Sequence, residues 1–249
     1  MLFAIGAGPQ VAAVSSFDDF PREAAAKPRV GALLDPDVER ILSMGPDLVA
    51  IYGSQTDLRR QLQRASIPIF DYRHAGLADV LSTLRALGAA TGRAAEADRV
   101  AADIDRRLSA VRTRTATASR PRTLLVFGRE PGALRGMYVA GGRGFLHDML
   151  VVAGGNNVFA DVARESVQAT TELVLARRPD VILEVREGAV LSDAEVAGRV
   201  ADWGSLASVP AVTNGRVHVI SGGGLVVPGP RVAAAVERLA EVLHPRRTP

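Results

Sequence analysis

The sequence predicts an α/β protein made of two similar halves with a long helix between them. Two phrases of the same form support this prediction, ERILSMGPDLVAI at residues 39–51 and ELVLARRPDVILE at residues 172–184. In each phrase a glutamate begins a helical stretch, Pro-Asp follows seven and eight residues later, and an aliphatic run comes next. A glutamate in the first turn suits the helix dipole, proline ends the helix, and the aliphatic run is typical of a buried strand. Because the glutamate and the proline both recur 133 positions later, we interpret the chain as two related α/β halves.

The first half is expected to alternate between helices and strands. Residues 2–5 are expected to end a short helix at Gly6, and residues 10–15 (QVAAVS) to form a short strand. Asp35 or Asp37 is placed to cap the helix that follows. The remaining elements of this half are a helix at 38–44, a strand at 48–52, a helix at 58–65 and a strand at 67–72.

A long helical region separates the halves. Apolar residues recur at helical spacing over residues 77–91 and again over residues 94–115, with Gly92 between them. At a rise of 1.5 Å per residue the second helix is about 33 Å long, which is enough to cross a small lobe. The divisions expected from this pattern are an N-terminal α/β lobe at 1–75, a connecting helical region at 76–118 and a C-terminal α/β lobe at 119–249.

The second half repeats the alternation of the first. Its strands are expected where short aliphatic runs occur, and its helices where apolar residues recur at helical spacing. The strands are expected at 123–127, 181–185 and 217–220, the helices at 145–153, 172–176, 196–201 and 232–243, and a glycine-rich loop at 222–229.

Composition excludes several classes of protein. A chain of 249 residues with 47% hydrophobic residues can bury a substantial core. Its 30 basic and 27 acidic residues leave a net charge of +3. The chain has few aromatic residues and no long Lys/Arg block, which argues against nucleic-acid binding. The absence of cysteine excludes disulfides, cysteine nucleophiles and thiolate metal sites. No apolar stretch reaches the roughly 18–20 residues that span a membrane.

No motif supports catalysis, so no catalytic residue is assigned and the protein is not expected to be an enzyme. The G-x-S-x-G and H-E-x-x-H patterns are both absent. The histidines show no i, i+4 spacing, which argues against a dedicated metal site. A single tyrosine could still be an axial ligand of a haem iron. The residues considered are His74, His147, His218 and His244 and the tyrosines Tyr52, Tyr72 and Tyr138.

Charged and glycine-rich segments after the strands are candidates for ligand contacts. Arg129 follows the strand at 123–127, so we expect its side chain either to point toward a ligand cleft or to lie solvated in a loop. An arginine in a cleft would bind a phosphate or a carboxylate. The glycine cluster at 141–144 matches neither a P-loop nor a dinucleotide-binding fingerprint, and we interpret it as a cleft loop.

Several motifs, taken in order, resemble one family. The segments LFAIGAG, VSSFDDFP, RVG, DVERILSMGPDLV, FLHDMLVVAGGNNVF, TELVLARRPDVIL and VPGPRV, with the long helix among them, resemble the class III periplasmic substrate-binding proteins of ABC importers. The resemblance covers essentially the whole chain. It implies two Rossmann-like lobes joined by a single long rigid backbone helix, residues 94–115, with the ligand in a cleft between the lobes. Family members have a first strand before LFAIGAG, so that strand is expected to be missing here.

The motifs are most similar to those of the vitamin B12-binding member of this family, and the resemblance implies site residues. Leu33 and Ser166 stand where that member has pocket tryptophans, and the loop at 222–225 replaces an acidic and aromatic loop. Glu39 and Glu172, the glutamates of the repeated phrases, are implied to pair with arginines of the permease dimer. The ligand-binding residues expected from the resemblance and from Arg129 are Phe17, Leu33, Tyr52, Phe127, Arg129, Tyr138, Ser166 and Gly223.

The resemblance implies a protein that captures cobalamin or a related corrinoid and delivers it to the permease, with no cofactor of its own. Haem and ferric siderophores are the alternatives within the family. From other classes, a partner-binding module that has lost its ligand stays open, and a metal-cluster oxidoreductase is disfavoured by the lack of cysteine. We expect a periplasmic or otherwise extracytoplasmic monomer that meets the membrane only through the permease or a lipid anchor.

Overall fold

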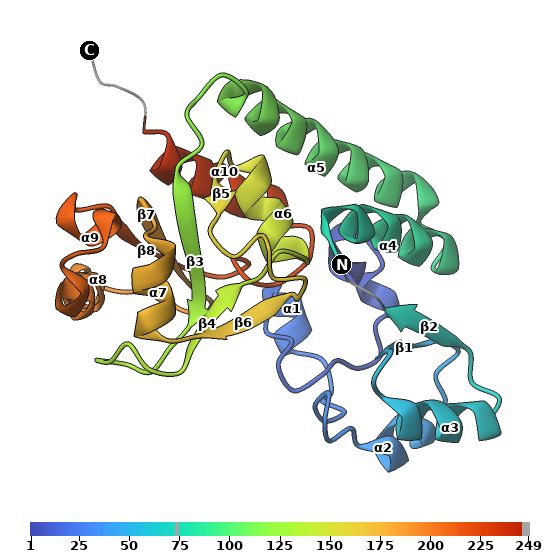
Figure 1. Cartoon of the computed structure of the whole chain (residues 1–249). Coiled ribbons are helices and arrows are strands. Elements are labelled where there is room, and N and C mark those ends of the chain that lie inside the picture. The colour runs from blue at the N-terminus through green and yellow to red at the C-terminus, as the bar shows by residue number, and fades with distance from the viewer. Residues whose placement is uncertain (73–74, 246–249) are drawn as a thin grey trace. The chain divides into compact units, whose positions relative to one another are not determined.

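The structure, a computed structural model, describes residues 1–72 and 75–245. The chain folds into two compact units (Figure 1). Unit 1 consists of Met1–Arg73 and Leu81–Ala102, and unit 2 consists of His74–Val80 and Asp103–Pro249. Each unit combines helices with parallel strands, so the fold is mixed α/β, as predicted.

The division between the units falls within two helices. Helix α4 (Leu77–Ala90) has its first turn in unit 2 and the rest in unit 1, and helix α5 (Ala94–Thr115) begins in unit 1 and ends in unit 2. The Asp148 carboxylate of helix α6 (Phe145–Val152) accepts the backbone N–H of Leu77 at 3.0 Å, which ties the first turn of α4 to unit 2. The bounds of α5 are those predicted. Helices α4 and α5 thus both have residues in each unit.

The N-terminal part of unit 1 is built from short helices and loops. The glycine stop expected at Gly6 is present, with the left-handed backbone that such a stop requires. The strand predicted at 10–15 is wrong: Val14 makes only an isolated bridge with Arg29, and the neighbouring Pro28 has no N–H with which to extend a ladder. The short helices here are η1 (Leu2–Ile5), η2 (Gly8–Gln10), α1 (Arg22–Ala25), α2 (Val38–Ser43) and α3 (Thr56–Arg64).

Two parallel strands form the sheet of unit 1. Strand β1 (Val49–Tyr52) pairs with strand β2 (Ile69–Tyr72) in register, so Tyr52 lies opposite Tyr72 at the carboxyl ends of the strands. Helices α2 and α3 cover the sheet through a small apolar core. Its buried residues are Ile41, Ile51, Leu58 and Leu62.

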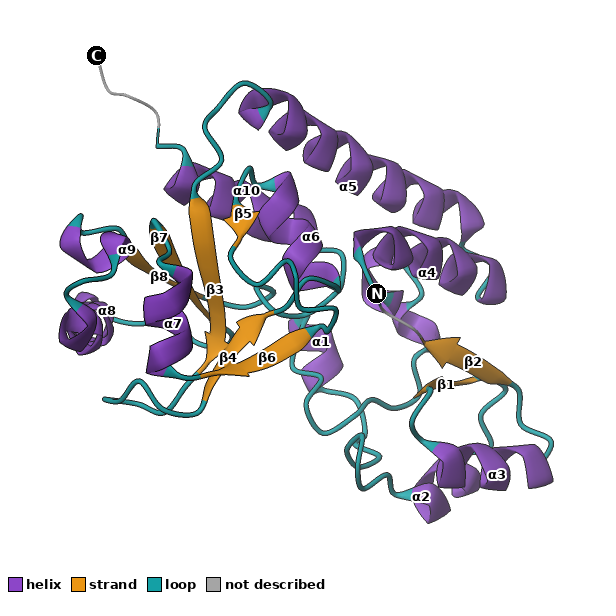
Figure 2. Ribbon diagram, viewed as in Figure 1, coloured by secondary structure: helices purple, strands orange, loops and turns teal. Residues whose placement is uncertain are grey.

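The sheet of unit 2 is larger and mixed (Figure 2). Its strand order is β6-β4-β3-β7-β8, with β5 paired to β3; β3, β7 and β8 are parallel, whereas β4 is antiparallel to both β3 and β6. Strands β4, β5 and β6 are short and were not predicted. The strands are β3 (Arg122–Gly128), β4 (Met137–Ala140), β5 (Asn156–Asn157), β6 (Ser166–Ala169), β7 (Val181–Arg186) and β8 (Val217–Ser221).

Helices pack against this sheet and enclose the main core. Trp203 and Phe159 are its largest fully buried side chains, and they pack with aliphatic residues of β3, β4 and β7. The predicted last helix, 232–243, agrees with α10. The remaining helices are α7 (Thr171–Arg177), α8 (Asp193–Asp202), η3 (Trp203–Leu206), α9 (Pro210–Thr213) and α10 (Val232–Leu243).

Candidate ligand-binding surfaces

In unit 1, two tyrosines lie side by side at the carboxyl ends of the parallel strands. The ring centroids of Tyr52 and Tyr72 are 5.8 Å apart, with the ring planes tilted by 56°. Burial, together with the charge of the neighbouring Tyr52, raises the pKa of Tyr72 to about 12. Tyr72 is therefore a neutral phenol at physiological pH. Carboxyl ends of parallel strands are the usual place for ligands in α/β sheets, so this pair marks a candidate surface.

Two polar side chains shape the loops around this pair. The amide of Gln55 accepts the backbone N–H of Tyr52 at 3.0 Å and donates to the carbonyl of Leu33 at 3.1 Å, so it joins two of the predicted ligand-binding residues. The guanidinium of Arg29 donates to the carbonyls of Ser15 and Asp18, both at 2.8 Å, and so fixes the loop that carries Phe17. Sequence reasoning did not assign a role to either side chain.

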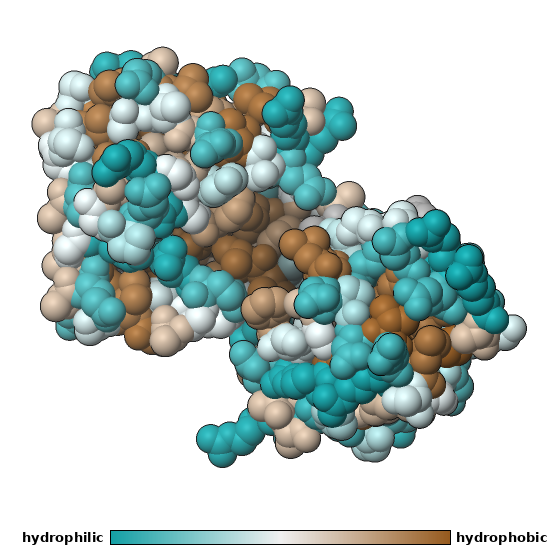
Figure 3. All heavy atoms as spheres, turned by 90° about the horizontal axis from the view of Figure 1, so that it is seen from below, coloured by the Kyte–Doolittle hydropathy of each residue, from teal (hydrophilic) through white to brown (hydrophobic). Residues whose placement is uncertain are grey.

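Large apolar side chains reach the surface around these loops. Phe17 is 79% exposed and Leu33 is 45% exposed. Apolar side chains that emerge among polar ones are visible on the face shown in Figure 3. Apolar side chains that form one contiguous exposed patch mark binding surfaces. The unit 1 surface is defined here as Phe17, Leu33, Tyr52 and Tyr72.

In unit 2, a β-bulge brings together another aromatic pair. Val126 pairs with Val139 and Gly128 pairs with Tyr138, so β3 has one residue more than β4, and Phe127 is the extra residue. Bulges re-aim side chains, and the rings of Phe127 and Tyr138 lie with centroids 6.3 Å apart. Phe127 is half-buried and the Tyr138 side chain is 46% exposed. Each unit thus has one aromatic pair on strands of its sheet.

The other two predicted residues of unit 2 are both exposed. Ser166 lies on β6, two residues from Gln168, which pairs with Tyr138. Because side chains alternate along a strand, Ser166 shares the sheet face of Tyr138. Gly223 lies in the loop after β8. The unit 2 surface is defined here as Phe127, Tyr138, Ser166 and Gly223.

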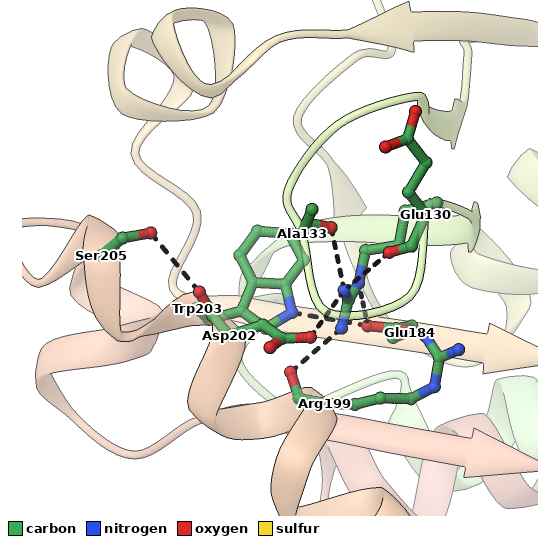
Figure 4. A network of polar contacts seen from close by, with 8 residues as sticks. Glu130, Ala133, Glu184, Arg199, Asp202, Trp203 and Ser205 are labelled. Carbon is green, nitrogen blue, oxygen red and sulfur yellow. Dashed lines mark hydrogen bonds and ion pairs between the residues drawn. The ribbon is translucent and has the colours of Figure 1, made fainter.

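Arg129 is not on this surface, and its assignment to the ligand is corrected. Its side chain is 0% exposed. Glu184 and Asp202, two of its partners, are labelled in Figure 4. The guanidinium donates to Glu184 and to Asp202, both at 2.8 Å. It also donates to the backbone carbonyls of Glu130, Ala133 and Arg199. Arg129 directly follows β3, and its guanidinium meets acids of β7 and α8 and not a ligand.

The partners of Arg129 form a closed charge network. Glu184 is fully buried in the middle of β7 and also pairs with Arg199, while the Trp203 indole N–H lies 3.5 Å from the same carboxylate. Two guanidinium groups thus face the two carboxylates of Glu184 and Asp202, which balances the buried charge. The sequence contains a signal for this buried charge, because the acidic Glu184 interrupts the aliphatic run VILEV. The network anchors the β3–β4 loop behind the Phe127–Tyr138 pair.

Glu39 and Glu172 occupy equivalent positions in the two units. Each is the second residue of its helix, α2 or α7, and each is exposed. The side chain of the N-cap residue accepts a backbone N–H in both helices: Asp37 accepts that of Arg40 in α2, and Thr170 accepts that of Leu173 in α7. Hydrogen bonds from Thr170, from its own backbone N–H and from Thr171 hold the pKa of Glu172 below its usual range. Glu172 is therefore ionised at neutral pH.

Neither a metal cluster nor a membrane span is present among the residues that the structure describes. No group of three or more His, Asp or Glu side chains in 1–72 and 75–245 is arranged to hold a metal ion. His74 lies outside the described residues. Every helix in the same ranges is too short or too polar to cross a lipid bilayer.

Comparison with known proteins identifies relatives. A family described as periplasmic binding protein matches residues 1–222. The vitamin B12-binding protein of Vibrio parahaemolyticus is 25% identical over 241 residues, covering 96% of this chain and 83% of its own. The uncharacterized ABC transporter substrate-binding lipoprotein YvrC of Bacillus subtilis is 28% identical over 248 residues, covering 98% of this chain and 76% of its own. The solved structure of the periplasmic heme-binding protein RhuT from Roseiflexus has a TM-score of 0.78 at 26% identity, covering 97% of this chain and 92% of its own.

Proposed function

The chain belongs to the periplasmic binding protein family, and on that premise we propose that it captures a corrinoid such as cobalamin and delivers it to an ABC importer. Proteins of this family bind their ligands and catalyse no reaction. The observation that carries the proposal is the aromatic pair in each unit, Tyr52–Tyr72 and Phe127–Tyr138. Both pairs lie at ends of strands where α/β sheets place ligands.

Aromatic surfaces suit a large, flat ligand. Burying the apolar face of a macrocycle against Tyr and Phe rings gives affinity, and the phenol groups keep a polar edge for hydrogen bonds. We propose that the unit 1 surface and the unit 2 surface each offer contacts of this kind. The similarity to the vitamin B12-binding protein of Vibrio parahaemolyticus supports a corrinoid as the first candidate.

Haem is the second candidate, and a specific observation favours it. Haem carriers can bind iron through a tyrosine, and Tyr52 ends a parallel strand on an apolar surface. The similarity to the heme-binding protein RhuT supports this alternative. Burial, together with the neighbouring Tyr52, raises the pKa of Tyr72 to about 12, which opposes loss of its proton. We therefore propose Tyr52 as the ligand of a bound haem iron.

The exposed glutamates suit docking to a permease. Glu39 and Glu172 stand at the same position of equivalent helices, one in each unit. Arginines contact carboxylates directionally, so a two-fold permease with one arginine cluster per subunit would match this pair. This role places the protein outside the cytoplasmic membrane, where the ligand is captured.

Calorimetric titration with cyanocobalamin and with haemin tests the proposal. We expect one of the two to bind with a Kd in the micromolar range or tighter, which corresponds to about 8 kcal/mol. If haemin binds, the Tyr52→Phe variant should lose the spectrum of tyrosine-ligated iron, whereas Tyr72→Phe should keep it. Absence of binding of either molecule by the folded protein would rule out the proposed function.

A further inference from the structure

The amino ends of the parallel strands of unit 2 carry a group of arginines. Arg122 begins β3, Arg178 lies shortly before β7, and Arg216 lies directly before β8. These strands are adjacent and parallel, so neighbouring strands lie about 5 Å apart and the three arginines start from one edge of the sheet. Hydrogen bonds join the three segments at this edge. The guanidinium of Arg122 donates to the carbonyl of Arg177 at 2.6 Å, and the carbonyl of Arg216 accepts the N–H of Ile182 at 3.0 Å.

The end of helix α5 brings three more arginines to the same edge. Arg112 and Arg114 lie on its last turn, and Arg120 lies in the loop that leads from α5 to β3. Burial lowers the pKa of His244, and the charges of Arg216 and Arg114 lower it further, so these two arginines lie near one imidazole. All of these arginines are exposed except Arg216, which is half-buried. The basic edge is defined here as Arg112, Arg114, Arg120, Arg122, Arg178 and Arg216.

Carboxylates neutralise little of this charge. In the part of the chain that the structure describes, no arginine of the basic edge forms an ion pair, whereas the nearby Arg177 pairs with Asp161 at 2.6 Å. The carboxylates on the same segments are those of Asp180, which accepts the backbone N–H of Arg122 at 3.1 Å, and of Glu241, on the last turn of α10. Because the whole chain has a net charge of only +3, the basic edge is a local concentration of positive charge.

The basic edge lacks the apolar centre that protein interfaces have. None of the large apolar side chains that are exposed among the described residues lies in 112–122, 178–180 or 214–216. Specific protein interfaces bury an apolar core that is rich in aromatic residues. An anionic bilayer, by contrast, attracts basic residues through the charge of its phosphate groups. The composition of this edge therefore favours a lipid surface over a protein partner.

We propose that the basic edge rests on the anionic phosphate groups of a lipid bilayer. The choice of a bilayer rests on the proposed function, because a protein that delivers a ligand to an ABC importer works beside the membrane that holds the importer. Guanidinium groups bind phosphate oxygens through paired donors, and each basic residue near an anionic bilayer strengthens the attraction. The contact is electrostatic and sensitive to salt, so it concentrates the protein at the membrane reversibly.

Cosedimentation of the protein with lipid vesicles tests this inference. At an ionic strength of about 0.1 M, we expect binding to vesicles of phosphatidylglycerol and phosphatidylcholine in equal parts and no binding to phosphatidylcholine alone. Salt at about 1 M, where the screening length is about 3 Å, should release the protein. A variant that lacks three exposed arginines of the basic edge should bind the mixed vesicles about tenfold to hundredfold more weakly. Its substitutions are Arg112→Gln, Arg114→Gln and Arg178→Gln.

A matched variant removes the same charge from the opposite edge of the sheet. Strand β7 is six residues long, so the two edges lie about 20 Å apart, which exceeds the screening length of about 10 Å at 0.1 M. We therefore expect this variant to bind the mixed vesicles within about twofold of the wild type. Thermal unfolding shows whether both variants are folded. The substitutions of the matched variant are Arg135→Gln, in the β3–β4 loop, Arg186→Gln, at the end of β7, and Arg238→Gln, which donates to the carbonyl of Ser221 at the end of β8.

Several outcomes would overturn this inference while the proposed function stands. One is equal weakening of vesicle binding by the two variants, and another is a wild type that ignores the mixed vesicles. Release of the protein by inorganic phosphate at matched ionic strength would indicate a site for a free anion. Preference for polyglutamate over the mixed vesicles would indicate an acidic protein partner. Calorimetry with cyanocobalamin and haemin tests the proposed function separately, because it needs no lipid.

Discussion

Arg129 and Glu184 form an ion pair inside unit 2 that solvent does not reach, with 2.8 Å between Nε and Oε2 and side chains 0% and 1% exposed. The pair joins the end of β3 to the middle of β7, and Asp202 and Arg199 complete it. A buried charge without its partner is costly, because neither water nor another group replaces the lost interaction. The network is therefore a structural anchor for the loop behind the Phe127–Tyr138 pair.

Removal of the Arg129 guanidinium should destabilise the protein strongly. We expect Arg129→Met to lower the free energy of unfolding by about 3 kcal/mol, because it leaves the Glu184 and Asp202 carboxylates short of positive charge. Denaturant unfolding measures the change. The matched control is Arg135→Met, whose side chain is 82% exposed and which should change stability by less than about 0.5 kcal/mol.

A double variant gives this prediction a second test. Adding Glu184→Gln to Arg129→Met should recover part of the lost stability, since the buried carboxylate is then neutral. Additive losses from the two substitutions would show that Arg129 and Glu184 do not depend on each other.

The elements that could be predicted from the sequence are those with long, regular patterns. The helices at 94–115 and 232–243 have the predicted bounds, because helical spacing over many residues is a strong local signal. Strand β4 (Met137–Ala140) and strand β6 (Ser166–Ala169) were missed. Their pairing in the mixed sheet depends on residues distant in sequence, and such short segments carry little local signal.

The candidate site shows the same limit. The exposure of Phe17 and Tyr138 agrees with a surface role, but the burial of Arg129 depends on Asp202, which lies 73 positions later in the chain. Sequence order indicated that Arg129 follows a strand and did not indicate which side chains would surround its guanidinium. The roles of Gln55 and Arg29 were also hidden, because each acts by bonding to backbone carbonyls of other loops.

Truncation of Tyr138 should weaken ligand binding with little effect on folding. Tyr138 is 46% exposed, and its ring centroid lies 6.3 Å from that of Phe127. Tyr138→Ala should therefore raise the Kd of the bound ligand about tenfold to hundredfold, as for an aromatic residue at the centre of an interface. Calorimetry measures the Kd. Val151→Ala, at a position of α6 that is 38% exposed, is the control and should leave the Kd unchanged. An unaltered Kd for Tyr138→Ala would remove the unit 2 surface from the proposed site.

The contact between α5 and α10 should give a pH-dependent contribution to stability. Arg107 donates to Glu237 at 2.8 and 2.7 Å, and these hydrogen bonds hold the pKa of Glu237 below its ordinary value of 4.5. A depressed pKa in the folded state means that the contribution is complete above pH 4.5 and is lost as the pH falls through the lower, folded value. Because both side chains are about one third exposed, the contribution should be about 1 kcal/mol or less.

The Glu237→Gln variant isolates this contribution. We expect it to unfold at a lower temperature than the wild type at pH 7, and the difference to shrink as the pH is lowered below 4.5. Thermal unfolding followed by circular dichroism at several pH values measures both curves. A difference that stays constant down to pH 3 would show that the ion pair is not its cause.

Charge reversal at the two equivalent glutamates should separate transport from binding. Glu39 and Glu172 are exposed at the starts of α2 and α7, and neither belongs to the unit 1 surface or the unit 2 surface. We expect the double variant Glu39→Arg/Glu172→Arg to abolish delivery to the permease, because each new arginine would meet a positive partner. Ligand affinity should stay within about twofold of the wild type, since neither side chain belongs to those surfaces.

Uptake into cells that carry the matching importer measures delivery, and calorimetry measures affinity. Glu23→Arg, on the short helix α1, is the control for added charge and should transport normally. If affinity falls together with uptake, Glu39 and Glu172 contact the ligand and not the permease.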